Sequence, residues 1–154
     1  MSIEPGFSGP HLACAFLCEK VLLERDNVPT FVRVVDRFTV PVFQNLPPGV
    51  QVPQPVIQLN LVVMLKAGTL GAGKYKIKII IQKPDGNRSP ENILEAFFSG
   101  SDDNGVMAVA PLVFPSPLEG LHWIDVYFEQ SLITRIPMRV LFQSTPLPFP
   151  VQER

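Results

Sequence analysis

The chain has 154 residues, and its 13 basic residues and 14 acidic residues give a formal net charge of −1. This length suits one domain with a hydrophobic core that needs neither a metal nor a disulfide for stability. The charge balance excludes the strongly basic surface that is typical of nucleic-acid binding proteins. A mean hydropathy of +0.22 predicts some exposed apolar surface, and with it self-association.

Proline is unusually frequent, with 17 residues. Because proline is excluded from helix interiors and here falls mostly between alternating segments, the pattern predicts many short strands and few helices. Cys14 and Cys18 would lie about 13 Å apart on one face of a strand, beyond the reach of a disulfide. Free thiols, no secretory signal in residues 1–11 and no bilayer-length apolar run predict a cytoplasmic protein.

The first third of the chain predicts a flexible arm followed by two strands. Residues 1–10 form the arm, and residues 11–18 form an apolar strand that extends toward residue 23. After a polar turn, residues 30–40 alternate between apolar and polar, and only Asp36 breaks the apolar face. A β-bulge at Asp36 is one interpretation of that break.

The next segment, residues 41–55, carries five prolines and predicts a long extended connection outside the sheets. Two cleanly alternating strands follow it, with a glycine-rich turn between them. Residues 88–105 leave two alternatives, a short helix with Pro90 at its first position or a short strand at 93–99. Residues 106–114 form an apolar strand that Pro111 interrupts.

The clearest pattern is a hairpin at residues 120–142, with a polar turn at 129–131. Its nominally outer face holds Trp123 and Tyr127, an aromatic pair that is either covered by another element or exposed as a contact surface. Its second strand holds Arg135, Pro137 and Arg139 on one face. Since proline is tolerated mainly at sheet edges, Pro137 predicts that this strand lies at an edge.

About eight strands at regular spacing predict an all-β fold, a single antiparallel β-sandwich of immunoglobulin-like character. The predicted organisation is a flexible N-terminal arm at 1–10, a sandwich domain at 11–143 and a proline-rich C-terminal tail at 144–154. We expect that tail to be extended rather than packed in a sheet.

No motif in the chain predicts a catalytic, cofactor or metal site. Residues 68–74 resemble a phosphate-binding loop, but Tyr75 stands where that loop needs a small hydroxyl, and a strand follows instead of a helix. Residues 101–105 supply too few carboxylates for calcium. His122 lies in the apolar register of its strand, so we interpret it as a half-buried, hydrogen-bonded residue. The prediction is a non-enzymatic protein without cofactors.

Three stretches carry a resemblance to a known family. The frame G-x-H-x-I-x-V-x-F followed by L-I-x-x-I-P-M-R-V resembles the closing hairpin of an uncharacterised family of small bacterial proteins. LACAFLCEKV and IQKPDG are similar to that family's first strand and central turn. The three stretches cover about a third of the chain. The resemblance implies an immunoglobulin-like sandwich and brings no catalytic residues.

Three functional hypotheses follow. The first is an interaction or structural module that binds a protein partner or a second copy of itself, without nucleic acid or membrane. Its candidate interaction surface consists of Trp123, Tyr127, Arg135, Pro137 and Arg139.

The second hypothesis is a small-ligand binder with a pocket between the 41–55 loop and the hairpin around Trp123. The third, an enzyme, would need His122, Asp125 or Glu129 to converge with residues from another strand.

Overall fold

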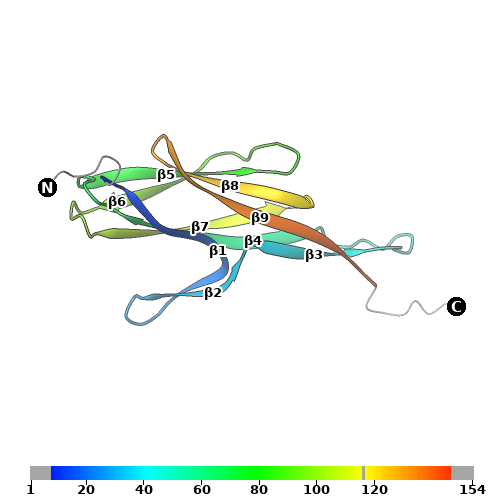
Figure 1. The fold of residues 1–154 in the computed structure, drawn as a ribbon. Coiled ribbons are helices and arrows are strands. Elements are labelled where there is room, and N and C mark those ends of the chain that lie inside the picture. The colour runs from blue at the N-terminus through cyan, green and yellow to red at the C-terminus, as the bar shows by residue number, and fades with distance from the viewer. Residues whose placement is uncertain (1–7, 116, 147–154) are drawn as a thin grey trace.

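The computed structural model describes residues 8–115 and 117–146, and these form two stacked β-sheets (Figure 1). Sheet A has the strand order β2-β1-β4-β7, and sheet B has the order β3-β9-β8-β5-β6. Within the described part of the chain, no helix is long and apolar enough to cross a membrane. The strands are β1 (His11–Leu23), β2 (Pro29–Val35), β3 (Arg37–Phe43), β4 (Val56–Lys66), β5 (Gly73–Gln82), β6 (Asn92–Phe98), β7 (Gly105–Pro115), β8 (Gly120–Phe128) and β9 (Ser131–Thr145).

The strand order confirms the predicted immunoglobulin-like sandwich. In immunoglobulin domains one sheet contains the third strand beside the sixth, with the seventh outside it, and the second and fifth strands pair in the other sheet. Here β5, β8 and β9 follow one another in sheet B, while β4 and β7 pair in sheet A. The β4 and β7 strands are antiparallel over their full length, from Val56 opposite Pro115 to Lys66 opposite Gly105.

The core lies between the two sheets and follows the period of two that β-strands impose. From β4 it receives Leu59, Leu61 and Val63, all buried. From β8 it receives Ile124 and Val126, which are equally inaccessible to solvent. Burial of these alternating residues fixes the register, because a slip by one residue would turn each apolar set to the opposite face.

The predicted strand at 30–40 is two strands rather than one. It breaks at Asp36, where β2 ends in sheet A and β3 begins in sheet B. The polar residue therefore marks a change of sheet and not a bulge, and the described residues contain nine strands instead of about eight. The prediction of a wholly antiparallel sandwich is also wrong at one place, since β3 runs parallel to β9.

The proline-rich connection begins later than predicted. Pro41 and Phe43 belong to β3, where they pair with Gln143 and Thr145 of β9. Proline is tolerated there because β3 is an edge strand. The same pairing extends β9 two residues into the predicted tail, whereas residues 147–154 and the first seven residues of the predicted N-terminal arm lie outside the described residues.

The ambiguous segment at 88–105 contains β6 and no helix, which decides between the two alternatives. Pro111 does not interrupt its strand either, because β7 runs unbroken across it as an edge of sheet A. The hairpin of β8 and β9 has the predicted faces and the predicted turn, in which Glu129 takes the left-handed conformation (φ 51°).

The predicted edge position of β9 holds at Pro137. The strand pairs with β8 alone over Ser131–Met138, with both β8 and β3 at Arg139 and Val140, and with β3 alone from Leu141 to Thr145. The backbone N–H of Arg139 donates to the carbonyl of Asp36 on the β3 side (3.0 Å). Because N–H groups two residues apart point the same way, the nitrogen of Pro137 faces that side before β3 has begun. Its missing donor therefore costs no sheet hydrogen bond.

Candidate interaction surfaces

The structure brings all five predicted surface residues together on the outer face of sheet B. Trp123 pairs with Pro137, and Leu121 pairs with Arg139. Tyr127 lies on the same face two residues beyond Asp125, which pairs with Arg135. Both aromatic side chains are half-buried, so neither is fully covered by another element.

A buried ion pair organises this face. The carboxylate of Asp125 is only 4% exposed, and it accepts a hydrogen bond from Nε of Arg135 at 2.7 Å. A second cation, Arg88, approaches the other carboxylate oxygen at 3.4 Å. Arg135 also donates to the side-chain oxygen of Gln82 (3.0 Å). The acid therefore has its charge balanced within the chain, as a buried carboxylate requires.

Cations also cover the two aromatic rings. The guanidinium of Arg135 lies 5.0 Å from the ring centre of Trp123, and Nζ of Lys78 lies 5.2 Å from that of Tyr127. Such contacts are attractive because the ring face carries negative charge. Asp125, Arg135, Trp123 and Tyr127 thus have partners already, and a protein that bound this cluster would have to displace or share them.

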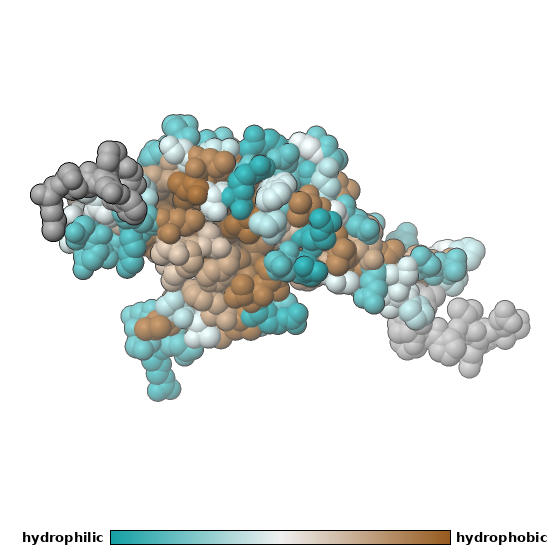
Figure 2. Space-filling view, in the orientation of Figure 1, coloured by the Kyte–Doolittle hydropathy of each residue, from teal (hydrophilic) through white to brown (hydrophobic). Residues whose placement is uncertain are grey.

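The outer face of sheet A is different, because apolar residues lie together across the middle of its strands β1, β4 and β7. Val62 on β4 is flanked by Phe16 on β1 and Val109 on β7. Met64 is flanked by Cys14 and Met107 in the same way. Figure 2 shows apolar surface gathered over β1 and toward the root of the β1–β2 hairpin. Apart from Val62 these residues are only half-buried, so the face forms an apolar patch that no described element covers completely.

Beside this patch, a two-stranded arm leaves the sandwich; we call residues 19–33 the β1–β2 arm. β1 pairs with β4 only as far as Cys18, and beyond that residue it pairs with β2 alone. Figure 1 shows the arm standing away from the two layers. Its root is held by an edge-to-face contact between Phe16 and Phe31, with ring centres 4.8 Å apart.

The arm has apolar side chains on both of its faces. Val21 pairs with Phe31, and Leu23 pairs with Pro29, so these four share one face. Because Phe31 contacts Phe16 on the outer face of sheet A, this row is turned toward the apolar patch. On the arm Leu22, Leu23 and Val28 are exposed, Leu23 to 66%.

Local chemistry fixes the tip of the arm. Asn27 takes the left-handed conformation (φ 63°), which asparagine tolerates better than most residues. Its N–H donates to the carbonyl of Glu24 (2.9 Å), and Oδ1 of Asp26 accepts from the N–H of Val28 (3.2 Å). The polar turn seen in the sequence is therefore a formed hairpin turn. What the sequence does not reveal is that the arm leaves the sheet, since this depends on where β4 stops pairing.

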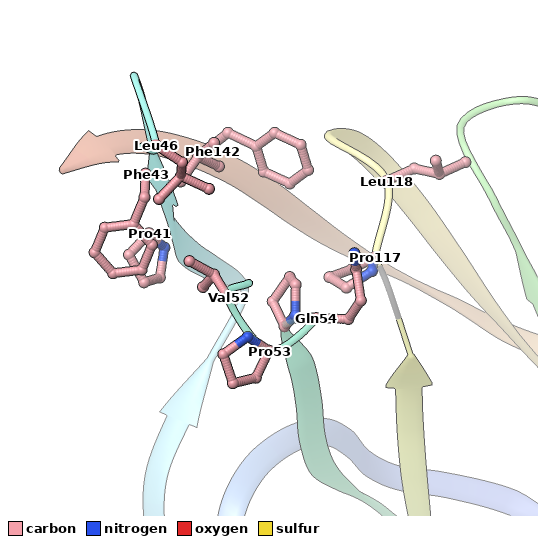
Figure 3. A pocket seen from close by; sticks show the side chains of 11 residues that line it. Pro41, Phe43, Leu46, Val52, Pro53, Gln54, Pro117, Leu118 and Phe142 are labelled. Atoms are coloured by element: carbon pink, nitrogen blue, oxygen red, sulfur yellow. The ribbon is translucent and has the colours of Figure 1, made fainter. Parts of the chain in front are cut away.

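A cavity of about 560 Å³ lies between the predicted 41–55 loop and β9 (Figure 3). It is lined mostly by apolar side chains: Pro41, Val42, Phe43, Leu46, Val52, Pro53, Pro55, Pro117, Leu118 and Phe142, together with Gln54. The predicted pocket therefore exists beside the C-terminal hairpin, but at Phe142. Trp123 does not line it, because that side chain lies on the outer face of sheet B.

The residues of the enzymatic hypothesis do not converge. His122 faces the core, whereas Asp125 lies on the opposite face of the same strand. Glu129 lies at the hairpin turn, where Oε1 accepts a hydrogen bond from the N–H of Lys76 (2.9 Å). No group of three or more His, Cys, Asp or Glu residues suited to a metal ion occurs among the residues that the structure describes.

Two buried side chains have altered proton affinities. Burial raises the pKa of the Cys18 thiol, which therefore stays protonated, and both cysteines are free. Burial also lowers the pKa of His122, which is 1% exposed, so its ring is neutral at pH 7. Nδ1 of His122 has no hydrogen-bond partner. The expectation of a half-buried histidine is thus wrong, and Nδ1 is unpaired although the nearby backbone of Gly120 opposes part of the lowering of the pKa.

Comparison with known proteins gives a structural similarity alone. No protein-family model matches the chain, and no curated protein matches it. Among solved structures, the chain is similar to an immunoglobulin-like protein from Pseudomonas aeruginosa. The identity is 11%, the match covers 83% of this chain and 97% of that chain, and the TM-score is 0.34.

Proposed function

We propose that the chain is a non-enzymatic protein-binding module that pairs with a second copy of itself through the β1–β2 arm and the outer face of sheet A. The observation that supports this is an arm of two strands that lies outside the sandwich. An isolated two-stranded hairpin is at best marginally stable in water. A partner that covered the exposed Leu22, Leu23 and Val28 would remove apolar surface from water and stabilise the arm.

The features of the surface favour a second copy as the partner. Each chain has both an apolar arm and an apolar sheet face, so a two-fold arrangement would cover both at once. The margin of the patch carries both signs of charge, including the Glu19–Arg33 pair at 3.2 Å and Lys20. A net charge of −1 adds little repulsion between copies.

Sedimentation velocity of the full chain over the micromolar range tests this proposal. We expect a species of twice the monomer mass of 17.1 kDa, in reversible equilibrium with the monomer. A monomer at every concentration would refute self-association, and a mass that grows without limit would refute a closed two-fold pair.

The second candidate function, binding of a small apolar ligand, is favoured by the cavity at Phe142. Its volume of about 560 Å³ lies in the range of known ligand sites. A naphthalene-based fluorescent probe would report binding there. The substitution Phe142→Ala should weaken probe binding about tenfold, while Phe97→Ala on β6, outside the cavity, should leave it unchanged. Equal effects of the two substitutions would exclude this cavity as the site.

A further inference from the structure

A smaller cavity lies at one end of the sandwich, and it shares Arg88 with the Asp125 cluster on the outer face of sheet B. Its volume is about 290 Å³, and strands from both sheets line it. Ile81 lies near the end of β5, Phe114 near the end of β7, and His122 near the start of β8. Leu118 and Pro117 close one wall, and they also border the larger cavity.

The loop over this cavity is held in place by hydrogen bonds. Ser89 exchanges two bonds with Ile81: its N–H donates to the carbonyl (2.8 Å), and its Oγ accepts from the N–H (2.9 Å). The N–H of Lys83 donates to the carbonyl of Asn87 (2.8 Å). A site that is formed before a ligand arrives loses less conformational entropy on binding.

The lining of this cavity has an apolar part and a cationic part. Ile81, Phe114 and Leu118 provide an apolar surface, and the ring of Phe114 meets that of His122 edge-on with centres 5.8 Å apart. Lys83 and Arg88 are the charged residues of the described lining, and both are cations. Arg88 retains capacity for an anion, because its contacts to Asp125 (3.4 Å) and to Tyr127 (3.5 Å) are long.

The third chemical feature is the imidazole of His122. This side chain is 1% exposed, and its Nδ1 is a buried nitrogen without a hydrogen-bond partner. Buried polar atoms in proteins are nearly always paired, and exceptions occur at functional sites. A neutral ring with its proton on Nε2 would present Nδ1 as an acceptor. A donor group placed in the cavity would therefore supply a missing bond.

We propose that this cavity binds a small organic acid with a ring-sized apolar body and a hydroxyl group. The carboxylate pairs with Lys83 and Arg88, and the body packs against Ile81, Phe114 and Leu118. The hydroxyl donates to Nδ1 of His122. The cavity volume of about 290 Å³ lies just below the roughly 300–1,000 Å³ of pockets that hold drug-sized ligands, which favours a small body of about one ring. This site is separate from the surface proposed for self-association.

Three probes separate the contributions of the hydroxyl and the carboxylate to binding. They are para-hydroxyphenylpropanoate, phenylpropanoate, which lacks the hydroxyl, and para-ethylphenol, which lacks the carboxylate. Titration of the full chain, followed by backbone amide NMR, should give saturable shifts at His122 and Ile81 with the hydroxy acid. Phenylpropanoate should bind about tenfold more weakly. Absence of saturable binding by all three probes would overturn the proposal.

Two substitutions test which residue binds the carboxylate of the probe and which binds its hydroxyl. Lys83→Met should weaken both acids about tenfold and leave ethylphenol unchanged, whereas Lys76→Met, on the outer face of sheet B, should change none of them. His122→Met should remove the advantage of the hydroxy acid over phenylpropanoate. Unchanged acid binding in Lys83→Met, or probe shifts confined to Phe142 and Phe43, would overturn the site. Since Lys83 lies at the protein surface, its variant stays informative even where His122→Met fails to fold.

Discussion

The two outer faces of this sandwich differ in how many of their side chains already have partners within the chain. On sheet B, Asp125 and Arg135 neutralise each other, and Arg135 covers the ring of Trp123. On sheet A, half-buried Phe16 and Met64 lie in an apolar patch, beside an arm whose Leu23 is exposed. A partner that bound the cluster of Asp125, Arg135 and Trp123 must compete with contacts inside the chain, whereas a partner on sheet A would bury apolar surface that is otherwise in water.

This difference shows why residue type alone is an uncertain guide to an interface. Trp, Tyr and Arg are enriched at binding hot spots, and these types select the outer face of sheet B. Here the same residues also stabilise their own sheet. The contact surface predicted at Trp123, Tyr127, Arg135, Pro137 and Arg139 stays a prediction, and the variants below separate it from the surface that we prefer.

The largest expected effect is on self-association. Leu23→Asp would place an unpaired charge in the proposed interface and should raise the dimer dissociation constant at least 100-fold, or about 2.7 kcal/mol. Phe97→Asp is the matched control, because Phe97 is 65% exposed and Leu23 is 66% exposed. Sedimentation velocity measures both. A comparable loss of dimer in Phe97→Asp or in Trp123→Ala would move the interface to sheet B.

The next effect concerns the stability of sheet B. Arg135→Met removes the closest partner of the buried Asp125 carboxylate and should lower the free energy of unfolding by about 2 kcal/mol. Arg139→Met changes the same residue type on the same face of β9 and should cost less than about 0.5 kcal/mol. Chemical denaturation measures both values. Equal costs would show that the ion pair does not organise this face.

The third effect is the dependence of stability on pH, which comes from His122 in the core. Because burial lowers the pKa of His122, the unfolded chain binds a proton at this residue more readily than the folded chain does. Stability should therefore be fully present above about pH 7 and fall as the pH drops through the ordinary histidine pKa of about 6.5. The loss should continue until the pH reaches the lower pKa that His122 has in the folded chain. His122→Met should flatten this profile, and an unchanged slope would contradict it.

The smallest effect tests the aromatic side of sheet B. Lys78→Met removes a cation over Tyr127 and a partly exposed ion pair with Glu91 (3.4 Å), and should cost about 0.5 kcal/mol. Lys76→Met, one strand period away on the same face, lacks the ring contact and should be neutral. High salt should reduce the difference between the variants, because screening weakens exposed pairs. A difference that grows with salt would argue against this interpretation.

Local patterns were enough to predict the sandwich and its C-terminal hairpin. Alternation in β4, β5 and β8 reflects burial on one face, which is a property of each strand alone. The crossing at Asp36 and the parallel pairing of β3 with β9 were not predictable in this way, because they depend on contacts between residues about 100 positions apart.

The candidate sites show the same limit. Alternation along the two strands of the hairpin predicts Trp123, Tyr127 and Arg135 on one face of the sheet, and the structure has them there. It did not indicate that Asp125 is the buried anion among them, or that Nδ1 of His122 lacks a partner, because both facts depend on neighbouring strands. For the arm, the sequence contains one indication. Apolar residues stand on both sides of the turn at 24–27, and a two-stranded hairpin alone cannot bury all of them.

The most direct test of the account is amide hydrogen exchange of the wild-type chain at low and high protein concentration, read by mass spectrometry. We expect the β1–β2 arm to exchange quickly when the chain is dilute and to become protected when it is concentrated. Peptides from β5 and β8 should exchange at the same rate in both conditions. Protection that rises with concentration on β8 and not on the arm would contradict the assignment of the interface to sheet A.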